Sequence, residues 1–364
     1  MNVNRRHLLT GSIGATAVAL TASACASEDG GGGGGSKKVG IAMPTKTSER
    51  WILDGDNLKA LFEEEGYEVT LQYANDEVDT QVSQIETMVS QNQDALVIAA
   101  INNEALNGVL AQAKEQDTTV ISYDRLILGT KDVDYYASFD NQQVGVLQGS
   151  YIVTALDLEN AEGPFNIELF AGSLDDNNTK YFFGGAMEQL QPYIDEGKLV
   201  VVSGQTDMEQ VATERWDGAL AQARMDDILS THYSAETRVD AILSPFDGIS
   251  RGVIASLEGG GYTPEELPVV TGQDTEVESI QSIIDGRQTS SVFKDTRDLA
   301  AVTVDMVVSI LNGDEPEGVN DTETYDNGEK VVPAVLLEPV NVDSSNFKEI
   351  VVDSGYVDAD KLTL

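Results

Sequence analysis

At 364 residues the chain is too long for one small core, so two domains of ordinary size are expected. It carries 62 acidic against 22 basic residues, a formal net charge of -40, which argues against nucleic acid or another polyanion as a partner. Such an acidic surface is also typical of a protein kept soluble in salt, because counterions screen the repulsion within roughly 8 Å at physiological ionic strength.

The first 25 residues predict an export signal that ends in a lipid anchor. Their stretch "NRRHLL" resembles a twin-arginine signal, and the apolar run after it is too short and too interrupted to span a membrane. "ASAC" resembles a lipobox ending at Cys25, although Ala22 stands where leucine is usual. The alternative is an ordinary signal with an incidental cysteine. Because Cys25 is the only cysteine, an internal disulfide and a cysteine-based metal site are both excluded.

Residues 26–36 are rich in glycine and predict a flexible tether, since they contain no apolar residue that could build a core. Beyond them, short apolar runs alternate with amphipathic segments. Leu58, Leu61 and Phe62 share one helical face. The runs predict strands over 38–43, 69–73, 95–100, 119–123, 165–170, 199–204, 240–244, 268–272 and 290–294. Strands that alternate with helices predict an α/β fold with two doubly wound parallel sheets.

Polar and aromatic side chains follow the predicted strands at their carboxyl ends, where open α/β sheets bind ligands. A sugar needs carboxylates and amides for its hydroxyls, cationic donors, and aromatic rings against its C–H face. The strand ends and the segments beside them supply this set: Arg50, Trp51, Asp124, Arg125, Asp176, Asn178, Trp216, Asp274 and Lys294. For any one of the acids alone, a helix cap or a surface ion pair is the favoured interpretation.

Catalysis is the rival use of paired carboxylates, as in glycoside hydrolysis. The sequence contains no GxSxG, no HExxH, no P-loop and no GxGxxG fingerprint. Of the two histidines, His7 lies in the export signal and His232 ends a predicted helical segment. We therefore expect no enzyme, no cofactor and no metal, while a glycosidase built on acids remains the alternative.

Long stretches of the chain resemble one family in order and in spacing. They include "TKTSERW", "VISYDRLI", "YYASFDNQQVG", "GSLDDNNTKYFFGGAMEQL", "TGQDTE" and "VFKDTR". The chain is similar in these stretches to the xylose-binding and ChvE-like multiple-sugar-binding proteins of bacterial ABC importers. The resemblance implies a type I periplasmic binding protein, which closes two lobes on one pyranose by a three-segment hinge.

The resemblance also implies which residues contact the sugar. It places the family's ligands on the residues named above and on the pair Phe246 and Asp247. Xylose-specific members have asparagine where this chain has Phe246, so the loss of that amide predicts a looser choice among sugars. Xylose, glucose, galactose and arabinose are the expected class.

The lobes implied by the resemblance are residues 37–139 with 294–337 and residues 140–293 with 338–364, with crossovers near Asp140, Lys294 and Glu338. The expected partners are a monosaccharide and an ABC permease, with the membrane reached only through the lipid anchor and the protein otherwise monomeric. A sugar receptor that acts mainly in chemosensing or signalling is one alternative. A sugar-responsive repressor is disfavoured, because such proteins begin with a helix-turn-helix.

Overall fold

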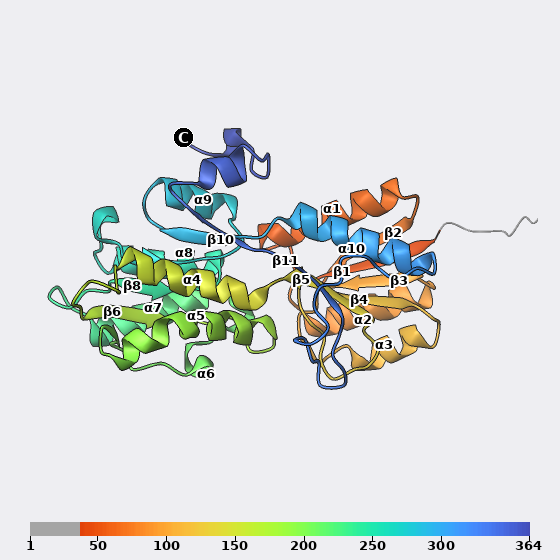
Figure 1. Ribbon diagram of the computed structural model, residues 1–364, viewed down its shortest axis with the longest axis horizontal. Helices are drawn as coiled ribbons and strands as arrows, with labels where there is room; N and C mark the ends of the chain where they lie inside the picture. Colours follow the sequence, from red (N-terminus) through yellow and green to blue (C-terminus); the bar gives the residue numbers. More distant parts are fainter. Residues whose placement is uncertain (1–36) are drawn as a thin grey trace, which may run out of the picture. The chain divides into compact units, whose positions relative to one another are not determined.

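The computed structural model describes residues 37–364, so the predicted export signal, Cys25 and the tether lie outside the described residues. Within them, no helix is long and apolar enough to cross a membrane. The fold is α/β, with helices on both faces of parallel sheets (Figure 1).

Six parallel strands form the first sheet, in the order β11-β5-β4-β3-β1-β2. They are β1 (Lys38–Met43), β2 (Glu68–Tyr73), β3 (Ala95–Ile98), β4 (Thr119–Tyr123), β5 (Tyr135–Phe139) and β11 (Ala334–Leu337). Two pairs of helices pack on its opposite faces: α1 (Glu49–Glu64) with α10 (Thr296–Leu311), and α2 (Val78–Ser90) with α3 (Asn107–Lys114). Because β1 and β3 are neighbours, the strand order reverses there and opens a ligand crevice at their carboxyl ends.

Four parallel strands form the second sheet, in the order β7-β6-β8-β9. They are β6 (Phe165–Leu169), β7 (Leu199–Val201), β8 (Ala241–Leu243) and β9 (Val269–Val270). Its helices are α4 (Asn141–Ala155) with α5 (Asn178–Asp195) on one face, α7 (Gly218–His232) with α8 (Asp247–Gly259) on the other, and the short α6 (Met208–Val211). Glycines let α4 and α5 approach closely, since a Cβ on Gly145 or Gly185 would meet the backbone of the facing helix.

A third, two-stranded sheet pairs β10 (Ser290–Phe293) with β12 (Val340–Asp343) in antiparallel fashion. A parallel bridge between Gln273 and Val292 joins β10 to the segment after β9. Helix α9 (Val277–Ile284) packs on β10 together with the C-terminal residues. The chain passes between the large sheets after β5, again between β10 and α10, and again between β11 and β12.

Every strand range predicted from the apolar runs contains a strand, so the α/β fold with parallel sheets is confirmed. The sequence analysis missed β5, because Ser138 interrupts its apolar pattern. Residues 331–342 are one mostly apolar stretch in the sequence, and the structure divides them into β11 and β12. The antiparallel pairing of β10 departs from the parallel sheets that alternating strands and helices predict.

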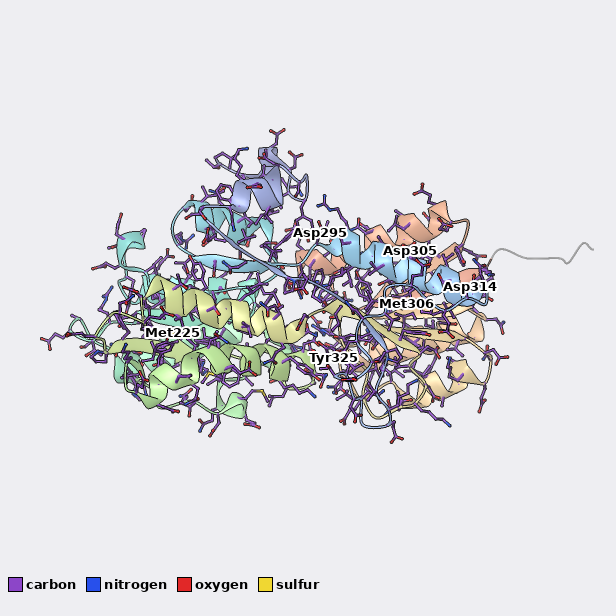
Figure 2. All side chains as sticks on the ribbon, viewed as in Figure 1. Met225, Asp295, Asp305, Met306, Asp314 and Tyr325 are labelled. Carbon is purple, nitrogen blue, oxygen red and sulfur yellow. The ribbon has the colours of Figure 1, made fainter. Side chains whose placement is uncertain are left out.

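The polar segment after α10 is a long loop, and two of its residues are buried in the core. Tyr325 is 1% exposed and packs edge-on against Tyr136, with ring centroids 5.0 Å apart. The amide of Asn327 donates to the carbonyls of Ile127 and Thr130. Figure 2 labels Tyr325 near the middle of the molecule, and on α10 it labels the exposed Asp305 beside the buried Met306.

Candidate functional site

A cavity of about 650 Å³ lies between the carboxyl ends of the strands of the two large sheets. Segments after β1, β3 and β4 line it from one side, and segments after β6, β8 and β9 from the other. Its volume falls in the range of sites for small organic ligands. The positions at which open α/β sheets bind ligands therefore meet in one space.

All of the predicted site residues except Asp247 line this cavity. These are Arg50, Trp51, Asp124, Arg125, Asp176, Asn178, Trp216, Phe246, Asp274 and Lys294. They come from both large sheets and from β10, so the structure brings residues that are far apart in sequence into one site.

Asp247 lies behind the wall of the cavity, which corrects the expectation that it faces the ligand. It is fully buried, and its Oδ1 accepts from Gln288 Nε2 and Ser291 Oγ, both at 2.9 Å. Its Oδ2 accepts from the backbone N–H of Glu276 at 3.0 Å. Burial and the negative charge of Glu276 raise the pKa of Asp247 to about 7. These neighbours occupy both carboxylate oxygens, so Asp247 supports the loop after β9.

Arg50 is the centre of a buried ionic cluster. Its guanidinium lies 2.9 Å from Asp54, 2.9 Å from Asp124 and 3.5 Å from Asp274. Burial by itself would lower the pKa of Arg50, but the carboxylates outweigh burial and raise it well above its usual value. Lys294 Nζ closes the cluster, 3.1 Å from Asp274 and 3.6 Å from Asp124.

Asp124 is held as a carboxylate by this cluster. Burial by itself would raise the pKa of Asp124, but Arg50, Lys294 and Arg125 outweigh burial and lower it to about 2. At neutral pH the group is therefore charged and can accept hydrogen bonds on both oxygens.

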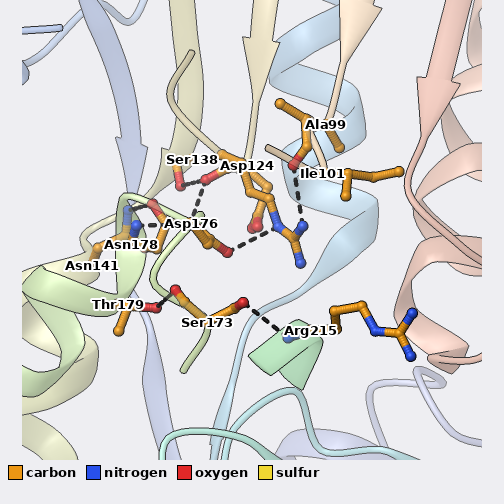
Figure 3. A network of polar contacts seen from close by, with 12 residues as sticks. Ala99, Ile101, Asp124, Ser138, Asn141, Ser173, Asp176, Asn178, Thr179 and Arg215 are labelled. Carbon is orange, nitrogen blue, oxygen red and sulfur yellow. Dashed lines mark hydrogen bonds and ion pairs between the residues drawn. The ribbon is translucent and has the colours of Figure 1, made fainter. Parts of the chain in front are cut away.

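The backbone of Asp124 is fixed as tightly as its side chain. Its φ is +60°, in the left-handed region that non-glycine residues rarely adopt. Its carbonyl accepts from the Tyr136 hydroxyl at 2.7 Å, from Asn178 Nδ2 at 2.9 Å and from Ser138 Oγ at 3.1 Å (Figure 3). Because Asn178 begins α5, one of these bonds reaches across from the second sheet.

Asp124 and Arg125 are neighbours in the sequence but have different ion-pair partners. Arg125 Nε lies 3.0 Å from Asp176 Oδ2, and its Nη1 donates to the Ala100 carbonyl at 3.1 Å. Burial raises the pKa of Asp176 even though Arg125 opposes the shift. Arg125 thus reaches the second sheet's side of the cavity, whereas the Asp124 carboxylate faces Arg50 of α1 and Lys294.

Aromatic rings form one wall of the cavity. Trp216 meets Phe182 and Phe246 edge-on, with ring centroids 6.2 Å and 6.1 Å apart. Trp216 lies directly over Gly172, where a Cβ would collide with its ring. Trp51 is only 5% exposed, and the guanidinium carbons of Arg50 and Arg125 lie 4.3 Å and 5.0 Å from its ring centroid. Trp216 is thus the more accessible of the two tryptophans.

Some buried polar atoms of residues that line the cavity are available to a ligand. Within residues 37–364, Arg50 Nη2, Trp216 Nε1 and Gln273 Oε1 have no hydrogen-bond partner, although their residues line the cavity. Buried polar groups are normally paired, because an unpaired one costs about 1 to 3 kcal/mol. A ligand whose groups both donate and accept would satisfy the two donors and the acceptor.

The sequence analysis missed Asp54 and Phe182, and helical spacing could have found both. Asp54 lies four residues after Arg50 in α1 and accepts from the Tyr123 hydroxyl. Phe182 lies four residues after Asn178 in α5 and lines the cavity. Residues four apart share a helical face, so each could have been assigned to the site with its partner. The exposed Arg215 also lines the cavity, and no helical spacing pointed to it. Its backbone N–H donates to Ser173 Oγ at 2.9 Å (Figure 3).

Residues 39–315 match the model of the periplasmic binding protein domain. The chain belongs to the periplasmic binding protein family. This family member is 62% identical over 320 residues to the multiple sugar-binding periplasmic protein SbpA of Azospirillum brasilense, covering 87% of this chain and 89% of that protein. It is 55% identical over 326 residues to the multiple sugar-binding periplasmic receptor ChvE of Rhizobium radiobacter, covering 89% of this chain and 92% of that protein. The resemblance seen in the sequence is therefore confirmed.

A solved structure shows the same fold as this periplasmic binding protein. It is an ABC transporter solute-binding protein from Clostridium phytofermentans with bound β-D-glucose, with a TM-score of 0.87 and 49% sequence identity. The match covers 90% of this chain and 100% of that chain.

Proposed function

We propose that this periplasmic binding protein captures a monosaccharide in the cavity between its sheets and delivers it to an ABC permease. Supporting this, the similar proteins SbpA and ChvE are described as binding multiple sugars, and the similar solved structure holds β-D-glucose. The expected ligands are xylose, glucose, galactose and arabinose.

The observation that carries the proposal is a cavity that combines buried charges of both signs with an aromatic wall. Asp124, Asp176 and Asp274 are the proposed acceptors for hydroxyls. Arg50, Arg125 and Lys294 are the proposed donors to the hydroxyls. The amide of Asn178 both donates and accepts. The proposed contacts with the C–H face of the sugar come from the rings of Trp51, Trp216 and Phe246. A cation and a carboxylate on the same hydroxyl fix both its proton and its lone pair, which makes each contact directional.

The proposed lobes are residues 37–139 with 294–337 and residues 140–293 with 338–364. The passages of the chain between the sheets support these limits, and Asp140 caps α4 at one of them by accepting from the Gln143 N–H at 3.0 Å. In this proposal the sugar bridges the lobes and shifts the protein toward a closed state through its higher affinity for that state.

The proposal extends to the cellular role of the protein. The chain is exported, is held at the outer face of the membrane through acylated Cys25, and acts as a monomer without cofactor or metal. It releases the sugar unchanged, since a receptor needs no catalytic group. The sequence "ASAC" supports the anchor.

A thermal-shift panel tests the proposal. A sugar that binds only the native state adds about 2.7 kcal/mol of stability at a hundredfold excess over its Kd, so the melting temperature should rise with xylose, glucose, galactose or arabinose. Sorbitol at the same concentration controls for general stabilisation by excluded polyols. If no pentose or hexose raises the melting temperature above the sorbitol control, the sugar-binding proposal is wrong.

A further inference from the structure

Two helices whose first residues meet beside the cavity have no side-chain caps of their own. Helix α1 packs on the first large sheet and begins after Ser48, and α9 packs on β10 and begins after Glu276. In neither helix does the side chain of the N-cap residue accept a hydrogen bond from its own first turn. The first N–H groups of a helix need an outside acceptor, and the positive end of the helix dipole favours a carboxylate there.

Each helix receives that carboxylate from the other. Glu276 Oε1 accepts from Ser48 Oγ at 2.8 Å and from the backbone N–H of Glu49 at 3.2 Å. In return, Glu49 Oε2 accepts from the backbone N–H of Val277 at 3.2 Å. The first residue of each helix is thus capped by a side chain from the opposite side of the cleft.

The side chain of Glu276 is oriented for this role by its own side of the cleft. Its Oε2 accepts from Arg251 Nη2 at 2.6 Å, which leaves Oε1 directed at α1. Arg251 is held in turn by Ser279 Oγ at 3.0 Å and by Glu278 at 3.4 Å. Glu276 is 7% exposed, so the contact is shielded from water and is stronger than a surface pair.

We propose that Glu49 and Glu276 form a reciprocal capping latch that holds the cleft closed over the bound sugar. The two glutamates are positioning residues. Glu276 lines the cavity, but its two carboxylate oxygens already accept from Arg251 and from the start of α1. Arg50 follows Glu49 directly, and Asp274 precedes Glu276 by two residues, with 3.5 Å between the Arg50 guanidinium and the Asp274 carboxylate. Closing the latch therefore brings this donor and acceptor to the ligand together. The inference rests on the proposed function.

The latch predicts a change in the rate of sugar release and little change in capture. Glu276→Ala removes the acceptor of α1, so dissociation should become about tenfold faster, as expected for the loss of charged hydrogen bonds. The association rate should stay within about twofold, because sugar enters before the latch forms. Glu278→Ala is the matched control, since Glu278 also contacts Arg251 but is exposed and lies on its own side of the cleft. Stopped-flow tryptophan fluorescence with glucose, or with the best sugar of the panel, measures both rates.

A second measurement follows the closed state itself, in the protein saturated with the best sugar of the panel. The Glu49 amide lies in the first turn of α1, where amides normally exchange fast with solvent, so its protection against hydrogen exchange reports the latch. It should be lost in Glu276→Ala and kept in Glu278→Ala. Unchanged protection in Glu276→Ala, or a dissociation rate equal to that of the control, would overturn the latch. If the wild type binds no sugar, the proposed function fails. The exchange measurement on the sugar-free protein, in which the fraction of closed molecules sets the protection of the Glu49 amide, then decides the latch alone.

Discussion

Replacing Asp124 by asparagine should destabilise the protein without any ligand. The side chain keeps its shape but loses the charge that faces Arg50 at 2.9 Å and Lys294 at 3.6 Å. Its pKa lies at about 2 against an ordinary value of 3.8, a difference of roughly 1.8 units, which corresponds to about 2.4 kcal/mol. Leaving buried cations unbalanced adds to this loss, so we expect the free energy of unfolding to fall by roughly 2 to 4 kcal/mol at pH 7.

The stabilisation by Asp124 should depend on pH. Because the pKa of Asp124 is lower in the folded state, its stabilisation is complete above pH 5 and is lost as the pH falls through 3.8 toward 2. With a pKa of 3.8 in the unfolded chain and about 2 in the folded protein, roughly half of the stabilisation by the Asp124 charge remains at about pH 3. The gap between wild type and Asp124→Asn should therefore narrow on acidification.

Urea unfolding followed by circular dichroism at pH 7 and at about pH 3 measures this gap. Glu63→Gln is the control, because Glu63 makes a surface pair with Lys59 at 3.8 Å, and such pairs contribute about 0 to 1 kcal/mol. A variant as stable as wild type at pH 7, or a gap that is equal at both pH values, would refute the argument that the cations of the cavity are balanced by Asp124.

Three further outcomes are expected. A sugar that binds should change tryptophan fluorescence, because both tryptophans line the cavity, and Trp216→Phe should remove more of the change than Trp51→Phe; an unchanged spectrum on binding would place both outside the contact. Gly172→Ala should weaken sugar affinity about tenfold or more, as measured by calorimetry, because a Cβ there displaces the Trp216 ring. Gly184→Ala should leave the affinity unchanged, because its Cβ would meet only Gln142 at 3.9 Å. In Glu276→Gln the pKa of Asp247 should fall below about 7 in a carbon-13 NMR titration, since burial remains but the adjacent charge is gone; a constant value would assign the shift to burial alone.

The sequence predicted those parts of the site that depend on where strands end. Asp124 follows its apolar run directly and Asp274 lies shortly after its own, and parallel strands in one sheet bring their carboxyl ends to one edge. Asp247 satisfied the same rule and still lies behind the wall, because the first residue of a helix can face the cavity or the neighbouring loop. Only the placement of Gln288 and Ser291 decides between the two.

Contacts between distant segments were beyond sequence reasoning. Glu49 and Glu276 each read as an ordinary acid near a helix start, and nothing local relates residues that are 227 positions apart. Tyr325 looked like part of a polar loop, because its burial depends on a pocket that Tyr136 and Tyr181 build from other elements. In both cases the determining partner is tertiary, and the surrounding sequence carries no periodic signal of it.

The strained backbone of Asp124 lowers the stability of the protein and orients the carboxylate before a ligand binds. A non-glycine residue at φ +60° costs on the order of 1 kcal/mol or more, and it persists only where its surroundings over-determine it. Here the donors from Tyr136, Ser138 and Asn178 fix the carbonyl, while Arg50 fixes the carboxylate. With the peptide and the side chain both held before a ligand arrives, binding does not have to order them, and each immobilised side chain otherwise costs about 0.5 to 1.5 kcal/mol of affinity. The strain at Asp124 is therefore offset by a carboxylate that already points into the cavity.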